Sequence, residues 1–277
     1  MDSLLTLLSI RGIGSIRARH LIEAFGSAQA VFDAPKDQLL QLGNIGQLIL
    51  ERVSDPKTEK RIEDELAFIE KNHIRPLIYG EEGYPKRLLE CEDAPALLFQ
   101  LGDTPLDETR IVSIVGTRNC TQYGRELVHR FVSELHEAFP NVIIVSGLAL
   151  GIDVESHKAA LNCGARTVGV IAHGLDRIYP SQHRSVAKEM LLNQGSLITE
   201  YMTGTEPERC NYLIFNNFSF LSTSFFCKIP SLFIIKIIGQ FGHIKKSIVN
   251  FCKNFQFFSL FSKNVPIWCP FTLPISL

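Results

Sequence analysis

The sequence predicts an α/β protein whose main domain is a Rossmann-like, doubly wound parallel sheet, preceded by a small all-α domain. Two observations lead to this fold class: apolar runs alternate with helical patterns after residue 110, and only helical patterns occur before residue 70. We expect strands at 111–115, 142–146, 166–172 and 196–200, and helices at about 123–138, 153–163 and 181–193. This alternation is typical of a parallel sheet with helices on both faces.

Residues 1–70 are expected to form a helix-hairpin-helix-like domain. Two helical patterns are each interrupted by a glycine turn, at Gly12-Ile13-Gly14 and at Gly43-Asn44-Ile45-Gly46. In one interpretation, these turns direct backbone N–H groups at a DNA phosphate, with Arg11, Arg17 and Arg19 nearby. In the other, the glycines only permit a tight helical turn. Acidic residues follow the second turn, which favours the structural interpretation for that copy.

Two loops of small residues follow the strands expected at 111–115 and 142–146. The first is Gly116-Thr117-Arg118, and the second runs from Ser146 to Asp153. A strand, a small-residue turn and a helix form a layout in which backbone N–H groups can approach a phosphate. We expect Asp153 to be the N-cap of the following helix and Arg118 to bind a phosphate through its guanidinium group. Ligands of such sheets bind beyond the carboxyl ends of the strands, where both loops lie.

Several longer motifs occur in a fixed order along the chain. They are Val115-Gly116-Thr117-Arg118 with Tyr123-Gly124, the segment Ser146 to Asp153 with His157, Gly174-Leu175-Asp176 with Tyr179-Pro180, and Glu200-Tyr201 with Gly204-Thr205-Glu206-Pro207. Together they resemble the DNA-processing protein A family, also called DprA or Smf, as far as about Arg209. Several motifs in order are far more specific than one glycine loop. The resemblance implies a protein that binds and protects incoming single-stranded DNA and loads the RecA recombinase in natural transformation. It also implies homodimers in intact family members.

The loops and the resemblance together give a set of candidate DNA- or phosphate-binding residues: Gly116, Thr117, Arg118, Ser146, Gly147, Gly151, His157 and Gly174. Two interpretations stay open for His157, which either contacts the ligand or packs inside the protein. Lys158 is either a phosphate contact or a solvated side chain. Arg177 and Arg184 are expected at the rim, and His173 could face the same crevice.

We expect a binding protein rather than an enzyme, with no catalytic residues, no cofactor and no metal. The sequence has no Walker A pattern, no His-Glu-x-x-His and no Gly-x-Ser-x-Gly, the motifs that commonly signal phosphate hydrolysis, zinc catalysis or a serine nucleophile. The alternative function is a Rossmann-like nucleotide-processing enzyme, specifically a nucleotide hydrolase.

The composition changes sharply near Arg209. All 29 Asp and Glu residues and all arginines lie at or before that position, and the rest of the chain is rich in Phe, Ile, Lys, Asn and Ser. A folded half-domain rarely lacks both acids and arginine, because its surface needs mixed charge. We therefore expect the N-terminal part of a DprA domain at 71–210, leaving the sheet incomplete. Residues 211–277 then read as the frameshifted product of an AT-rich gene, which cannot replace the missing strands. Function would be impaired, and the RecA contact surface would be missing. The alternative is a hydrophobic, membrane-associated tail, although no apolar run there is long enough to span a bilayer.

Charge and cysteine content restrict the function further. The tail has six lysines and no acid, so the part before it has a net charge of about -7, although the whole chain has -1. This excludes broad DNA binding by charge alone and requires a local basic site. The seven cysteines are scattered and include no Cys-x-x-Cys pair, which favours a reducing compartment. Without a signal sequence at its start, the chain is expected to be cytoplasmic and to have no membrane partner.

Overall fold

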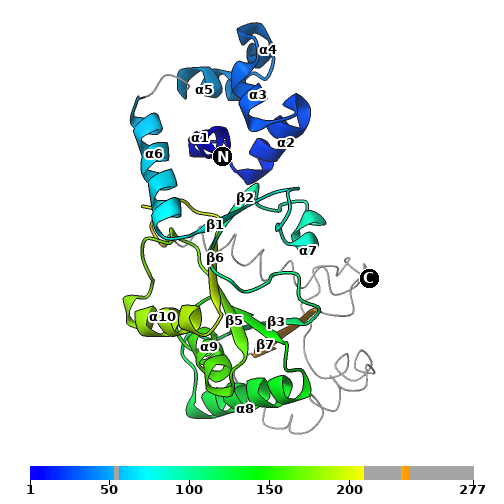
Figure 1. Ribbon diagram of the computed structural model, residues 1–277, viewed down its shortest axis with the longest axis vertical. Helices are drawn as coiled ribbons and strands as arrows, with labels where there is room; N and C mark the ends of the chain where they lie inside the picture. Colours follow the sequence, from blue (N-terminus) through cyan, green and yellow to red (C-terminus); the bar gives the residue numbers. More distant parts are fainter. Residues whose placement is uncertain (53–55, 209–231, 238–277) are drawn as a thin grey trace, which may run out of the picture.

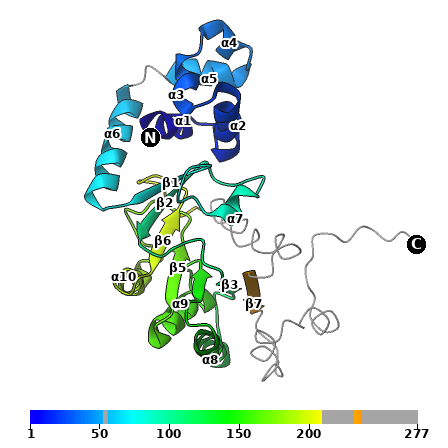
Figure 2. The same ribbon diagram turned by 45° about the vertical axis from the view of Figure 1, so that its right-hand side comes forward.

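The structure is a computed structural model that describes residues 1–52, 56–208 and 232–237 (Figure 1). The tail expected at 211–277 therefore lies outside the described residues, apart from one strand. A helical part occupies one end of the molecule and the sheet occupies the other (Figures 1 and 2). No helix within the two longer described ranges is both long enough and apolar enough to cross a bilayer.

The helical part contains six helices among the described residues: α1 (Asp2–Ser9), α2 (Ser15–Phe25), α3 (Ala28–Asp33), α4 (Lys36–Leu40), α5 (Asn44–Arg52) and α6 (Pro56–Lys71). Gly26 ends α2 in the left-handed conformation that glycine adopts without strain. Buried leucines of α1 share one core with Leu97 and Phe99 of the sheet. The helical part is therefore packed directly on the sheet.

Within the described part of the chain, the sheet has seven strands in the order β1-β2-β6-β5-β4-β3-β7. They are β1 (Arg75–Ile78), β2 (Leu97–Gly102), β3 (Ile111–Gly116), β4 (Ile143–Ser146), β5 (Arg166–Val170), β6 (Ser196–Thr199) and β7 (Leu232–Ile237). The α/β class is confirmed, and β3 to β6 are parallel as predicted. The prediction of a wholly parallel sheet needs correction, because β1 and β2 pair antiparallel and β2 pairs antiparallel with β6. The sheet is therefore mixed.

Strand β7 lies beside β3, on the side away from β4. Its backbone runs parallel to β3, with Leu232 opposite Ile111 and Ile237 opposite Gly116. A segment of the tail thus pairs with β3, whereas we expected that the tail could not replace the missing strands; for these residues that expectation was wrong. Because the chain proceeds from β3 to β4 on one side and β7 lies on the other, strand order reverses at β3. In open α/β sheets the ligand crevice lies at such a reversal.

The main helices of the α/β part lie on one face of the sheet (Figure 2). Helices α8 (Gln122–Ala138) and α9 (Ile152–Cys163) pack on Val112, Ile114 and Ile144, and α10 (Arg184–Leu192) packs on Leu197. Among the described residues, only the short helix α7 (Lys86–Leu89) lies on the other face, so the expected arrangement with helices on both faces is met only in part. The physical reason is that β3 to β6 are added in one direction, and successive right-handed crossovers in one direction place their helices on one face.

The opposite face of the sheet is covered by a short segment. Ile143, Val168 and Ile198 pack against Tyr84 and Leu88 from the segment around α7 (Lys86–Leu89). The loops after β3 and β4 border an opening that is also lined by the first turns of α8 and α9 and by the short helix η1 (Ser181–His183). This opening is where the candidate site lies.

Candidate nucleic-acid interface

The loops after β3 and β4 are joined by the buried carboxylate of Asp153. The Gly116 N–H donates to Oδ1 of Asp153 at 3.4 Å, across 37 residues of sequence. The N–H groups of Gly147 and Ala149 also bond to this carboxylate. Asp153 is only 4% exposed and is not the N-cap of α9, since Gly151 occupies that position. The N-cap prediction is therefore corrected, and the N–H groups of Gly116 and Gly147 bind the protein's own carboxylate.

Burial raises the pKa of Asp153 to about 6, while the bonds from Gly116, Gly147 and Ala149 and the nearby Arg118 act in the opposite direction. Burial dominates because a carboxylate loses more solvation free energy inside a protein than these contacts return. The loop geometry at the carboxyl end of β3 thus depends on an acid that titrates slightly below neutral pH.

Two glycines allow the loops to approach each other. Gly151 has a φ of +81°, and a Cβ at this position would lie 2.1 Å from the carbonyl oxygen of Thr117. A Cβ on Gly116 would lie 2.5 Å from the Ile152 side chain. The Ile152 N–H donates to that same Thr117 oxygen at 3.1 Å. Both glycines therefore hold the start of α9 against the end of β3.

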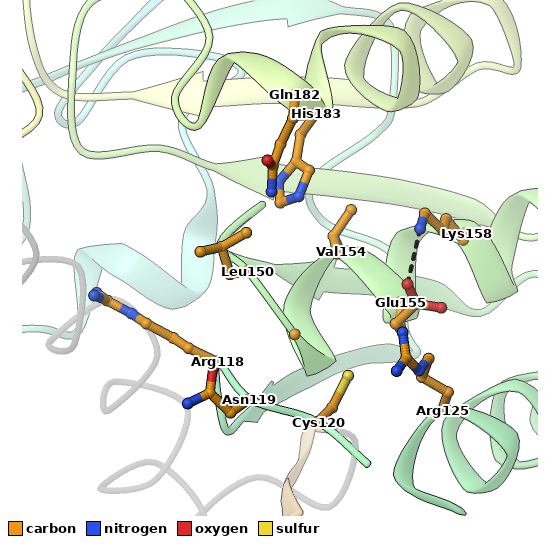
Figure 3. Close-up of a pocket in the computed structure, with 11 residues that line it drawn as sticks. Arg118, Asn119, Cys120, Arg125, Leu150, Val154, Glu155, Lys158, Gln182 and His183 are labelled. Carbon is orange, nitrogen blue, oxygen red and sulfur yellow. Dashed lines mark hydrogen bonds and ion pairs between the residues drawn. The ribbon is translucent and has the colours of Figure 1, made fainter. Parts of the chain in front are cut away.

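A pocket with a volume of about 450 Å³ opens beside these loops (Figure 3). Its walls come from the loop after β3, the first turns of α8 and α9, and η1. The lining residues are Arg118, Asn119, Cys120, Arg125, Leu150, Gly151, Val154, Glu155, Lys158, Gln182 and His183. Two arginines and one lysine face a single carboxylate there, so the pocket is locally basic within an acidic part of the chain.

The three cations come from three different elements. Arg118 follows β3, Arg125 lies on the first turn of α8, and Lys158 lies on the second turn of α9. All three side chains are exposed to solvent. Figure 3 shows Arg118 and Arg125 on opposite sides of the pocket, with Lys158 bonded to Glu155 on the side of Arg125. Cations placed around one hollow can contact successive oxygens of an anionic chain.

Glu155 is the acid of the pocket, and it is bonded on both oxygens. Lys158 Nζ lies 2.8 Å from Oε1 and His129 Nε2 lies 3.2 Å from Oε2. Burial acts to raise the pKa of Glu155, but the hydrogen bonds and charges of Lys158 and His129 hold it below its ordinary value. Glu155 therefore stays ionised at neutral pH and fixes the position of Lys158.

Among the predicted site residues, the structure places Arg118 and Gly151 in the lining, and also Lys158, whose role had been left open. Gly116 and Thr117 lie directly before Arg118 in the same loop, where the Thr117 Oγ1 accepts from the Asn119 N–H at 3.2 Å. Gly147 is buried against Asp153. These residues shape the loop rather than line the pocket.

Ser146 and His157 need a correction, because both are buried inside the protein. The Ser146 hydroxyl donates to the Ile114 carbonyl at 2.7 Å. His157 is 0% exposed, and its Nδ1 lies 2.7 Å from the Thr167 hydroxyl oxygen. Burial, followed by the neighbouring His183, lowers the pKa of His157 to about 3, so the ring is neutral. We therefore assign both residues a structural role in place of the expected contact.

The region around Gly174 lies apart from the pocket. A Cβ on Gly174 would lie 2.6 Å from the Met202 carbonyl oxygen, and its N–H donates to the Thr205 carbonyl at 3.3 Å. Arg177 pairs with Asp176 at 2.9 Å and also with Glu206. Two acids already bind the Arg177 guanidinium, so the predicted rim contact is not supported by its geometry.

Two other predicted side chains are also outside the lining. His173 is 0% exposed, and its Nδ1 lies 2.9 Å from the Gly174 carbonyl oxygen. Arg184 is exposed at the start of α10 but does not line the pocket. It therefore offers a matched control for arginines that do.

In the helical part, two of the three arginines near the first hairpin bond to the protein itself. Arg19 is 7% exposed, donates to the Glu92 carbonyl and lies over the Tyr79 ring at 4.6 Å. Arg17 Nη1 donates to the Gly12 carbonyl at 2.6 Å. At the second hairpin, a Cβ on Gly46 would lie 1.7 Å from the Leu39 carbonyl oxygen. The structural interpretation of these glycine turns is favoured over a phosphate site.

Sequence reasoning missed Arg125 and His183. Arg125 lies four residues after Thr121, whose side chain caps α8 by accepting from the Gly124 N–H. That Thr-x-x-Gly start could have placed Arg125 on the first turn, beside the loop that carries Arg118. His183 gave no comparable signal, because only the folded chain brings η1 next to α9.

Comparisons with known proteins agree with this fold. The family model for DNA recombination-mediator protein A matches residues 75–221. The DNA processing protein DprA of Bacillus subtilis is 37% identical over 148 residues, which cover 53% of this chain and 49% of that protein. Protein Smf of Escherichia coli is 30% identical over 209 residues, which cover 76% of this chain and 53% of that protein.

A solved structure of DNA processing protein A from Streptococcus pneumoniae superposes with a TM-score of 0.64 at 24% identity. The match covers 84% of this chain and 77% of that one, and it shows a shared fold. The chain spans about half the length of the curated relatives it matches. Since the family model matches more than half of its residues, the chain belongs to the family of DNA recombination-mediator protein A.

Proposed function

We propose that this chain binds single-stranded DNA through the pocket formed by Arg118, Arg125 and Lys158. The observation that carries the proposal is the convergence of three exposed cations from three elements on one hollow at the carboxyl end of β3. The surrounding part of the chain is acidic, so the attraction for a polyanion is local. The relative in B. subtilis is named a DNA processing protein, which supports the same class of function.

The shape of the pocket favours a single strand over a duplex. A volume of about 450 Å³ is in the range of pockets that enclose a small molecule. A flexible single strand can bend one nucleotide and its phosphates into such a hollow. A duplex is stiff and keeps its bases paired inside, so it cannot place a single nucleotide there. Leu150, which is 41% exposed at the mouth, gives an apolar surface against which a base can lie.

Binding is favoured over catalysis. The Ser146 hydroxyl donates to a backbone carbonyl, and His157 is buried and neutral, so neither forms a nucleophile–base pair. We extend the proposal to protection of incoming DNA and to loading of RecA in the cytoplasm, on the basis of the family resemblance. These finer roles rest on the family, since the chain spans about half of its relatives.

The proposal is tested by measuring the anisotropy of a labelled oligo-dT with the full chain and with Arg118→Ala. Loss of one charge-assisted contact should weaken binding by roughly 1–3 kcal/mol. The slope of log affinity against log salt should become shallower by about 0.7, the value for one phosphate on a single strand. Arg184→Ala removes an exposed arginine outside the pocket and should change neither quantity. Equal binding by all three proteins, with intact circular dichroism spectra, would exclude the pocket as the DNA site.

A further inference from the structure

The two ring nitrogens of His183 have different surroundings: one is hydrogen-bonded to the backbone, and the other is directed toward the pocket. It is the last residue of η1, is 6% exposed and belongs to the pocket lining. Its Nδ1 lies 2.8 Å from the carbonyl oxygen of Leu148. A carbonyl oxygen only accepts hydrogen bonds, so Nδ1 must carry the proton and donate it. This bond fixes both the tautomer and the orientation of the ring.

The fixed orientation leaves Nε2 for the pocket. Within the described residues, no hydrogen bond to Nε2 of His183 is present. Figure 3 shows the ring pointing from η1 toward Leu150 and Val154, into the hollow. In the neutral ring Nε2 is an acceptor, and in the protonated ring it becomes a second N–H donor. Only the protonated ring can donate to a phosphate oxygen.

The charged and titratable groups that line the pocket with His183 are Arg118 and Cys120 from the loop after β3, Arg125 from α8, and Glu155 and Lys158 from α9. His157 of α9 also interacts electrostatically with His183. Glu155 stays ionised because its pKa is lowered by its partners, and His157 stays neutral because its pKa is about 3. Arginine and lysine remain cations below pH 8. Histidine is the side chain whose charge ordinarily changes between about pH 5 and 8.

We propose that Nε2 of His183 is a phosphate contact that forms on protonation of the ring, so that single-stranded DNA binds more tightly as the pH falls. The inference rests on the proposed function of the pocket. An anion beside Nε2 stabilises the imidazolium, so a phosphate bound there favours protonation of the ring. By linkage, a complex that takes up a proton is strengthened by acid.

Two near-isosteric variants separate the roles of the two ring nitrogens. In His183→Asn the side-chain amide nitrogen lies near the position of Nδ1, so it can still donate to Leu148 while the pocket nitrogen is lost. In His183→Gln the amide nitrogen lies near the position of Nε2 and donates at any pH, while the bond to Leu148 is lost. Neither amide takes up a proton in this range, so both variants should lose the pH dependence.

The experiment measures the affinity of the full chain for labelled oligo-dT from pH 5.5 to pH 8. Thymine gains no proton in this range, so the DNA itself contributes no titration. The wild-type affinity should rise by roughly 5-fold or more as the pH falls, as expected for one charge-assisted contact. In both His183 variants, the ratio of the affinity at pH 5.5 to the affinity at pH 8 should fall to about one-third of the wild-type ratio or less.

Two further variants make the result specific. His20→Asn removes an exposed histidine of α2 and should keep the wild-type ratio. Asp153 is present in all these proteins, so its own titration cancels in the comparison. Arg118→Ala tests the proposed function separately, since it should weaken binding at every pH.

The outcomes are distinguishable. If Arg118→Ala has no effect, the proposed function fails. If Arg118 matters but both His183 variants keep the full pH ratio, or lose affinity equally at every pH, His183 is not a protonated phosphate contact. A flattened profile in His20→Asn instead of the His183 variants also overturns the inference. Should His183→Asn not fold, His183→Gln still decides, because it lacks the titrating ring.

Discussion

Asp153 occupies the position that the loop pattern predicts for a bound anion. Its carboxylate accepts the N–H groups of Gly116, Gly147 and Ala149, which a phosphate would otherwise be expected to use. The protein thereby supplies its own anion to the backbone turn. This leaves the recognition of an external phosphate to side chains, and Arg118 is the first of these.

The titration of Asp153 gives a prediction about stability. Its pKa is higher in the folded protein, about 6, than its ordinary value of 3.8. A carboxyl group of this kind favours folding when protonated; the advantage is full below its ordinary pKa and is lost as the pH rises through 6. The unfolding free energy of the wild type, minus that of Asp153→Asn, should fall by roughly 3 kcal/mol or less over this window. Urea denaturation of both proteins at a series of pH values measures the difference. A pH-independent difference would contradict the assignment.

Single residues also show what the sequence can and cannot predict at the site. Arg118 could be placed because it directly follows an apolar run that ends in glycine. The role of Asp153 could not, since its partner Gly116 is 37 residues away and burial of the acid depends on how two loops meet. His183 was missed for the same reason, as its bond to Leu148 spans 35 residues.

The contact between the end of β3 and the start of α9 is the element-scale feature that shapes the pocket. Gly151 and Gly116 let the two backbones approach, and the Ile152 N–H closes the contact on the Thr117 carbonyl. The contact fixes where α9 begins. It therefore also fixes where Lys158 lies relative to Arg118.

Gly151→Ala should disturb this contact more than an alanine at another glycine with a positive φ. Gly204 has a φ of +75°, close to the +81° of Gly151, but a Cβ there would meet no atom within 4 Å. Gly204→Ala should therefore cost only the conformational strain, about 1–2 kcal/mol. Gly151→Ala should cost roughly 1–3 kcal/mol more, because its Cβ overlaps the Thr117 oxygen. Thermal unfolding of the two variants tests this, and equal losses would contradict the steric argument.

The positions of most elements follow from the sequence, whereas their pairing does not. Strand β3 was expected at 111–115 and lies at Ile111–Gly116; helix α8 was expected at about 123–138 and lies at Gln122–Ala138. Apolar periodicity is local, so it locates such elements well. The antiparallel pairing of β2 with β6 joins residues about a hundred positions apart, such as Phe99 and Thr199. No local pattern encodes it.

The helical part and the sheet are tied together by polar contacts as well as by a shared core. Glu65 of α6 is 3% exposed, and its Oε2 accepts from the Thr203 N–H at 2.9 Å. It also accepts from the Thr203 hydroxyl. Arg61 Nη2 lies 3.5 Å from the Thr203 carbonyl oxygen. The loop after β6 is therefore held by α6, which couples the two parts of the molecule.

Removing the Glu65 carboxylate should weaken this coupling. Glu65→Ala leaves the Thr203 N–H without its acceptor and should lower the unfolding free energy by about 1–3 kcal/mol. Glu63→Ala, an exposed position on the same helix, should change it by less than about 0.5 kcal/mol. Denaturant unfolding provides the free energies. Limited proteolysis should cut the loop around Thr203 faster in the first variant only; equal cleavage in both variants would argue against the coupling.

At the scale of the whole molecule, the central claim is that DNA lies in the pocket at the end of β3 and not on the glycine hairpins of the helical part. Photo-crosslinking of the full chain to a single-stranded oligonucleotide of 4-thiothymidine, followed by peptide mass spectrometry, tests it most directly. The account predicts crosslinks within 117–125, 150–158 and 181–184. Crosslinks confined to the hairpin segments 11–20 and 43–51, with none at the pocket, would contradict it.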